Sequence, residues 1–96
     1  MKKIENKKVD VKKTDIKNYF RFIAISINVP PEGGYSIIEM RNRMKILDKI
    51  TNGNELKDSA EFEDSEFKCI KECVNKMRWG IISKDIIKFA DYINSL

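Results

Sequence analysis

Histidine is absent from this chain of 96 residues, and cysteine, proline and tryptophan are scarce. Without histidine, the commonest general base, proton shuttle and transition-metal ligand of proteins is missing. No nucleophile elbow and no glycine-rich phosphate loop compensates for that absence. We therefore expect a protein that is not an enzyme and that holds no cofactor.

The two cysteines are the remaining candidates for metal or redox chemistry. Cys69 and Cys73 lie four positions apart in a stretch of helical periodicity, which is a poor geometry for a disulfide. Neither a CxxC pair nor a second cluster of ligands accompanies them, which argues against a zinc site. We expect no metal, and two small buried or half-buried side chains in a reducing cytoplasm.

Long apolar runs are also missing. No run approaches the roughly 20 residues of a membrane span, and no apolar segment of a signal peptide follows the basic N-terminus. The sequence therefore predicts a cytoplasmic protein without a membrane partner. Its length, with 42% apolar and 35% charged residues, suits one small globular domain.

Positive charge is concentrated at the N-terminus. The net charge is +4, and residues 1–13 hold six lysines against two carboxylates, so the remainder of the chain is neutral. We expect residues 1–15 to form a flexible Lys-rich arm ahead of a single helical domain over residues 16–96, because no apolar pattern anchors the first segment. Such an arm can steer a protein toward nucleic acid or an acidic partner.

Residues 16–29 favour a β-strand. Their β-branched side chains alternate at a period of two, as Ile23, Ile25, Ile27 and Val29. Pro30–Pro31 should end this strand, and a short helix over residues 15–24 is the main competitor. A lone strand leaves its edges unpaired, so it should pair with a short strand within residues 54–62 or with a second copy in a homodimer.

Three helices are expected after this strand. The first begins at an S-x-x-E capping box, Ser36 with Glu39, and ends before Asn52–Gly53. The second begins near residues 63–65 and is stopped by Trp79–Gly80, and the third opens at Ser83. The apolar stripe of the first helix should face the core and consists of Ile37, Met40, Met44, Leu47 and Ile50.

These elements predict a mostly α fold. The expected architecture is an N-terminal strand or extended arm followed by a compact three-helix bundle. A small α+β fold is the alternative.

Five side chains are candidates for contacting a partner. Arg41, Arg43 and Lys45 form a basic face of the first helix, which suits phosphates or an acidic protein surface. Arg78 and Trp79 follow the second helix, and an exposed Trp–Arg pair is a frequent composition of interface hot spots. A tryptophan buried as a large anchor of a small domain is the alternative for Trp79.

Two other features allow a structural and a functional interpretation. The carboxylates within residues 61–66 suit a helix N-terminus, or they could hold a divalent cation. Gly33–Gly34 suit the turn before a capped helix, or they could cradle an anion. We favour the structural interpretation of both, because no further ligand cluster or phosphate loop accompanies them.

Short motifs are distributed over residues 30–93, namely Pro30–Ser36, Glu39–Arg43, Lys45–Asp48, Phe62–Phe67, Met77–Gly80 and Asp85–Phe89. Their combination resembles small proteins encoded by bacterial viruses and prophages. This resemblance implies an accessory protein without catalytic activity in the cytoplasm of the host cell. Such proteins include virion assembly factors and stoichiometric inhibitors of host immunity.

The leading hypothesis for function is therefore stoichiometric binding to another protein, and the resemblance implies an anti-CRISPR-like inhibitor of a host defence complex. One alternative is nucleic-acid or nucleotide binding through the Lys-rich arm and the basic face of the first helix. Another is an accessory role in virion assembly.

Overall fold

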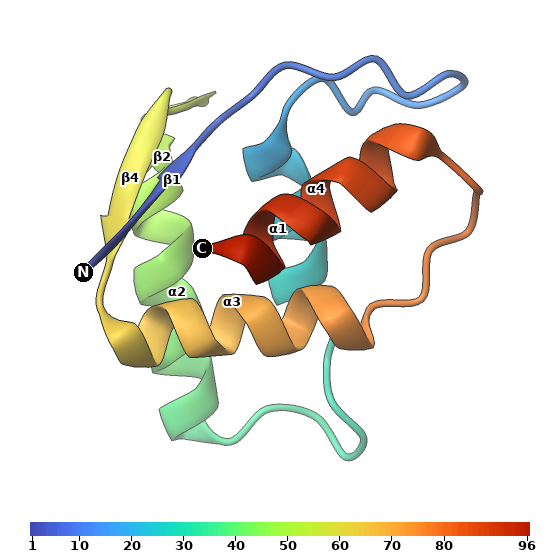
Figure 1. Ribbon diagram of the computed structural model, residues 1–96. Coiled ribbons are helices and arrows are strands. Elements are labelled where there is room, and N and C mark those ends of the chain that lie inside the picture. The colour runs from blue at the N-terminus through green and yellow to red at the C-terminus, as the bar shows by residue number, and fades with distance from the viewer.

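The computed structural model describes all 96 residues as four helices and two small antiparallel sheets (Figure 1). In chain order the elements are β1 (Lys2–Glu5), α1 (Tyr19–Ile27), α2 (Ile37–Ile50), β2 (Thr51–Asn52), β3 (Glu55–Leu56), β4 (Ser59–Phe62), α3 (Asp64–Lys76) and α4 (Lys84–Ser95). The prediction of a three-helix bundle behind a strand is therefore wrong, and the fold is α+β. None of the helices combines the length and the apolar content needed to cross a membrane.

The fourth helix, α1, lies where the sequence favoured a strand. Asn18 caps it, since its side chain accepts a hydrogen bond from the Arg21 amide at 2.9 Å. The apolar residues of this segment satisfy both periods, and the buried ones include Tyr19, Ile23 and Ile27 at a helical spacing of four. A helix satisfies its own backbone hydrogen bonds, whereas a central strand would need partners on both edges. Because α1 packs against α2 and α3, helical burial prevails here.

The N-terminal residues, expected to be a flexible arm, are packed against the body. β1 pairs antiparallel with β4, with Ile4 opposite Ala60, and the Glu5 amide donates to the Tyr92 hydroxyl at 2.9 Å. Ile4 is completely buried, and Val11 is buried further along the segment. The expected short strand within residues 54–62 is present as β4, but its partner is β1 and not residues 16–29.

The starts of the three predicted helices are confirmed, but the second of them, α3, ends at Lys76 and so before the predicted stop at Trp79–Gly80. Ser36 and Glu39 form the capping box of α2, with the Glu39 amide donating to the Ser36 hydroxyl at 3.1 Å. The Ser83 hydroxyl accepts from the Asp85 amide at the start of α4. These starts could be predicted because each depends on hydrogen bonds between residues two or three positions apart.

The prediction that the apolar stripe of α2 faces the core is wrong for its N-terminal half. Ile46 and Ile50 are fully buried, whereas Ile37, Met40 and Met44 are exposed. In Figure 1 the first turns of α2 extend beyond α3 at the lower end of the molecule. The side chains on these turns therefore have no core to enter.

A buried ion pair ties α2 to α3. The Glu66 carboxylate is buried and accepts hydrogen bonds from the Lys49 ammonium and from the Glu63 amide. Burial opposes ionisation of this carboxyl, but the two hydrogen bonds and the charge of Lys49 lower the pKa of Glu66 below its ordinary value of 4.5. The carboxylate form is therefore the one that the fold stabilises.

We expect Ile4→Ala to lower the free energy of unfolding by about 2–5 kcal/mol, because it leaves a cavity where β1 meets the core. Lys3→Ala, on the exposed side of the same strand, is the matched control and should change it by less than about 0.5 kcal/mol. Urea denaturation followed by circular dichroism measures both. Equal effects of the two substitutions would show that the N-terminal residues are not part of the folded core.

We expect Glu66→Gln to destabilise the protein by about 1–3 kcal/mol at neutral pH, because the hydrogen bonds to the carboxylate lose their charge. The folded pKa of Glu66 is lowered, so this stability is complete above the unfolded value and is lost as the pH falls through the folded value. The difference between the wild type and the variant should therefore be largest at neutral pH and should shrink as the pH falls below the ordinary carboxyl value of 4.5. Thermal denaturation across this range tests it, and a constant difference would contradict the ion pair.

Candidate functional site

The exposed face of α2 carries large apolar side chains. Ile37, Met40 and Met44 follow one another at spacings of three and four, so they form one stripe, which we name the α2 ridge. Their side chains are between 46% and 63% exposed, although each is large and apolar. Scattered apolar residues are ordinary on protein surfaces, but a continuous stripe indicates a contact surface.

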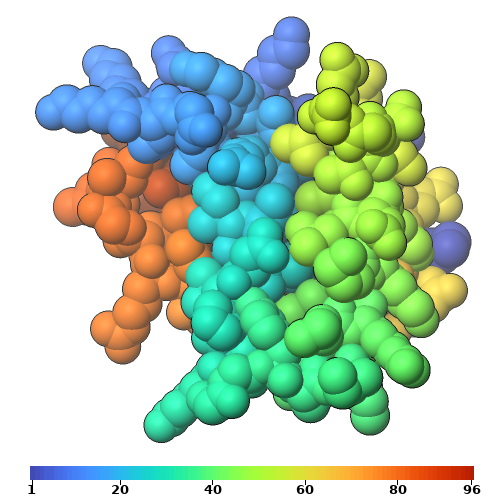
Figure 2. Space-filling model, turned by 180° about the vertical axis from the view of Figure 1, so that it is seen from behind, coloured from blue at the N-terminus to red at the C-terminus, as the bar shows by residue number.

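A shallow groove runs beside the α2 ridge. It has a volume of about 70 Å³ and lies between the C-terminal end of α1 and the middle of α2. Figure 2 shows this face, with α1 in cyan beside α2 in green and the loop between them projecting below. The groove is lined mainly by apolar side chains and consists of Ile27, Asn28, Tyr35, Met40, Arg43, Met44 and Leu47.

Arg43 fixes the wall of this groove. Its guanidinium Nη1 donates to the Ile27 carbonyl at 2.8 Å and to the Val29 carbonyl at 3.1 Å. The guanidinium also lies 4.8 Å from the centroid of the Tyr35 ring. Sequence analysis proposed Arg43 as a contact to a partner, and the structure places it as a partly buried tie between α2 and the end of α1.

Arg41 and Lys45 remain free on the same helix. Both are exposed, and neither forms a salt bridge or a side-chain hydrogen bond. Their spacing of four places them on one face of α2, next to the α2 ridge. The structure therefore combines two of the predicted basic residues with an apolar stripe that the sequence assigned to the core.

Arg78 and Trp79 lie elsewhere. They belong to the segment between α3 and α4, which lies on the side of the molecule opposite α2 in both Figure 1 and Figure 2. Arg78 is exposed, whereas Trp79 is partly buried, with its ring centroid 5.4 Å from that of Phe22 at an angle of 85°. The five predicted residues thus do not form one site, and the geometry of Trp79 agrees with the anchor interpretation.

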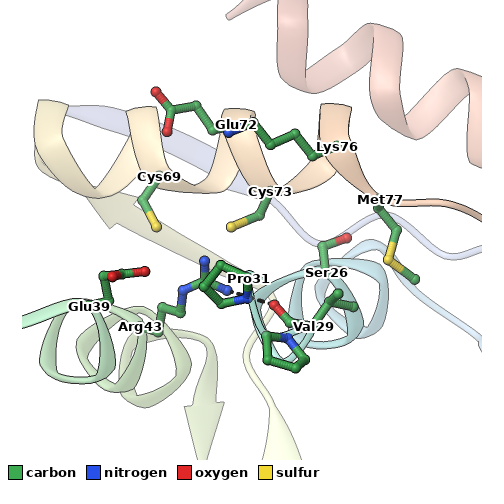
Figure 3. A pocket seen from close by; sticks show the side chains of 11 residues that line it. Ser26, Val29, Pro31, Glu39, Arg43, Cys69, Glu72, Cys73, Lys76 and Met77 are labelled. Carbon is green, nitrogen blue, oxygen red and sulfur yellow. Dashed lines mark hydrogen bonds between the residues drawn. The ribbon is translucent and has the colours of Figure 1, made fainter. Parts of the chain in front are cut away.

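A second cavity opens on the other side of Arg43. It has a volume of about 330 Å³ and lies between α3 and the loop that follows α1 (Figure 3). The sulfur atoms of Cys69, Cys73 and Met77 are directed from α3 into it, with Arg43 and Pro31 on the facing side. We name it the sulfur cavity. Both cysteines are half-buried as expected, but sequence analysis missed that they share a cavity with Met77, although the spacing of four residues was visible.

The thiols of the sulfur cavity differ in acidity. The neighbouring Cys69 thiol lowers the pKa of Cys73 to about 7 against the effect of burial, and the charge of Arg43 adds to this lowering. The pKa of Cys69 is raised by the same interaction and by burial. Cys73 is therefore the thiol that ionises first.

The other features singled out in the sequence have structural roles. Glu63 and Glu66 form a capping box at the start of α3, and Glu66 also pairs with Lys49. No group of three histidine, cysteine, aspartate or glutamate side chains converges as metal ligands do. Gly33 and Gly34 have φ values of 85° and 89°, which the turn before α2 requires and which glycine adopts without strain.

We expect Cys73 to react with iodoacetamide before Cys69, with a rate that is half-maximal near pH 7, because the thiolate is the nucleophile. Arg43→Met should move this midpoint upward by roughly one unit, since a nearby cation favours the thiolate. Peptide mass spectrometry of samples quenched at successive times identifies the modified thiol. Preferential reaction at Cys69 would contradict the assignment.

Comparison of the chain with models of protein families, with curated proteins and with solved structures finds no match. The geometry of the molecule itself is therefore the basis for assigning a function. That geometry consists of an apolar ridge and groove flanked by Arg41 and Lys45 on α2, and of a sulfur cavity on the other side of Arg43.

Proposed function

We propose that this protein acts by stoichiometric binding to another protein, without turnover, and that the α2 ridge and its groove form the contact. The observation that carries the proposal is the exposure of Ile37, Met40 and Met44 on a helix whose other face is buried in the core. A helix with apolar residues on both sides is stable in a monomer only at the cost of exposed apolar surface. Covering this surface with a partner removes that cost.

The composition of the surface suits protein recognition. Full burial of a large apolar side chain contributes about 1.5–3 kcal/mol. Covering the three half-exposed residues of the ridge therefore contributes a part of this amount for each residue to the free energy of binding. The unbranched methionine side chains can adapt to the shape of a partner. The groove between Tyr35 and Leu47 offers a place for one apolar side chain of that partner.

The charges beside the ridge define the rest of the expected partner. Arg41 and Lys45 are unpaired and adjacent to the apolar stripe, so carboxylates on the facing surface would complement them. We therefore infer a partner with an apolar projection bordered by acidic residues. The resemblance to phage-encoded accessory proteins suggests a host defence complex or a component of the virion as its source.

Nucleic-acid binding is the alternative, and it would use a different surface. The lysines of residues 1–13 lie on and beyond β1, and Lys2 and Lys7 lie over the rings of Phe67 and Tyr92. None of these lysines lines the groove of α2. A nucleic acid would therefore leave the exposed apolar ridge uncovered, and for this reason we favour a protein.

The test places a photo-crosslinking amino acid at Met44 and, as a matched control, at the exposed Asp91 of α4. After irradiation in the host cell, we expect one discrete protein adduct from position 44 and none from position 91. Ile37→Asp in the same chain should remove that adduct by weakening binding roughly tenfold or more. Circular dichroism should show an unchanged fold, because Ile37 is exposed.

Each other outcome has a defined meaning. An adduct of twice the mass of the chain would show that the ridge binds a second copy, and an adduct with nucleic acid would favour the alternative. Either result, or equal labelling from positions 44 and 91, would overturn the proposed function.

A further inference from the structure

The sulfur cavity has the features of a small-molecule site that protein binding at α2 does not use. Its volume of about 330 Å³ lies at the lower end of the range for ligand pockets. Its walls come from three separate parts of the chain, the end of α1 with its loop, α2 and α3. The cavity is therefore built by the tertiary fold and is not a gap between neighbouring side chains of one helix.

The thiols give this cavity a reactive group. Cys69 and Cys73 are both half-buried, so a ligand inside the cavity can reach them while bulk solvent is partly excluded. In Figure 3 their sulfur atoms are directed toward Arg43. The acidity of Cys73, which is raised by Cys69 and Arg43, supports its role as the attacking thiolate.

Charged groups of both signs line the sulfur cavity. Arg43 and Lys76 supply positive charge, and Glu39 and Glu72 supply negative charge. Arg43 uses only Nη1 for its hydrogen bonds to the carbonyls of Ile27 and Val29, so its other nitrogens have no protein acceptor. A ligand that carries both carboxylates and an ammonium group complements such a lining, whereas a neutral or purely cationic ligand does not.

We propose that Cys73 is a site of mixed-disulfide formation with a small zwitterionic disulfide of the glutathione class, whose carboxylates are held by Arg43 and Lys76. The Cys73 thiolate attacks one sulfur of the disulfide, a new sulfur–sulfur bond forms, and the original one breaks. The leaving thiolate takes a proton from water. Cys73 is oxidised and the departing sulfur is reduced, so the exchange needs no other reactant.

The helix geometry explains why the product persists. Residues four apart on a helix have Cβ atoms about 5–6 Å apart, whereas a disulfide requires about 3.5–4.5 Å. Cys69 therefore cannot displace the bound thiol and close a Cys69–Cys73 disulfide without distorting α3. Cys69 positions and acidifies Cys73 but does not resolve the mixed disulfide.

The test compares the rates at which oxidised glutathione, neutral hydroxyethyl disulfide and cationic cystamine modify the folded protein at pH 7. Intact mass gives the rate and peptide mass spectrometry gives the position. We expect Cys73 to be modified. We also expect the ratio of the rate with oxidised glutathione to the rate with hydroxyethyl disulfide to be about fivefold higher in the folded protein than in the urea-unfolded chain. A change in thiol acidity alone alters the rates with all three disulfides by the same factor, so it leaves the ratio unchanged. A change in the ratio therefore reports recognition of the disulfide.

Two variants and a control separate recognition from folding. Arg43→Met should reduce the ratio toward that of the unfolded chain, and Lys76→Gln, at an exposed position, should do so without the risk of unfolding. Lys45→Gln, on α2 and outside the sulfur cavity, should leave the ratio unchanged. A ratio equal to that of the unfolded chain, preferential modification of Cys69, or a loss of two mass units from an internal disulfide would overturn the proposal.

Discussion

The hydrogen bonds of the Arg43 guanidinium to the carbonyls of Ile27 and Val29 are the contact on which both candidate surfaces depend. These carbonyls belong to the last residue of α1 and to the loop that follows it, where a helix leaves acceptors without internal partners. A charged donor from α2 satisfies them and fixes the angle at which the chain leaves α1. The same side chain lies over Tyr35 and lines both the groove of α2 and the sulfur cavity.

The opposite end of the molecule is closed by the N-terminal segment. β1 covers the edge of β4 and inserts Ile4 into the core, while the Tyr92 hydroxyl of α4 accepts from the Glu5 amide. A strand of only four residues holds the N-terminal segment on the body because the side chain of Ile4 is completely buried and the partner strand is equally short. The lysines of this segment consequently lie on the surface of a folded element, where their positions are fixed relative to the body.

The two surfaces differ in the chemistry that they offer. The α2 ridge is apolar, adaptable and bordered by free cations, which suits a protein partner, whereas the sulfur cavity is small, mixed in charge and reactive. Arg43 belongs to the walls of both, so the two surfaces share one anchored side chain. Substitution of Arg43 affects both surfaces, whereas Met44 and Lys76 each belong to one of them.

The sequence by itself determined the capped starts of α2, α3 and α4, because each start depends on hydrogen bonds between residues two or three positions apart. It also indicated half-buried cysteines and the basic residues Arg41 and Lys45. Tertiary structure decided the rest. The alternating isoleucines of α1 favoured a strand, although Tyr19, Ile23 and Ile27 also recur at helical spacing, and packing against other helices made the helix the stable form.

Tertiary structure also decided which faces are covered. Spacing identifies an apolar stripe such as Ile37, Met40 and Met44, but it does not reveal that the helix extends beyond the core at that end. Similarly, one helix positions Cys69 and Cys73 on a common face, whereas the cavity before them exists only because Arg43 and the loop after α1 face α3. Local hydrogen bonding is encoded within a few residues, while exposure depends on where distant segments pack.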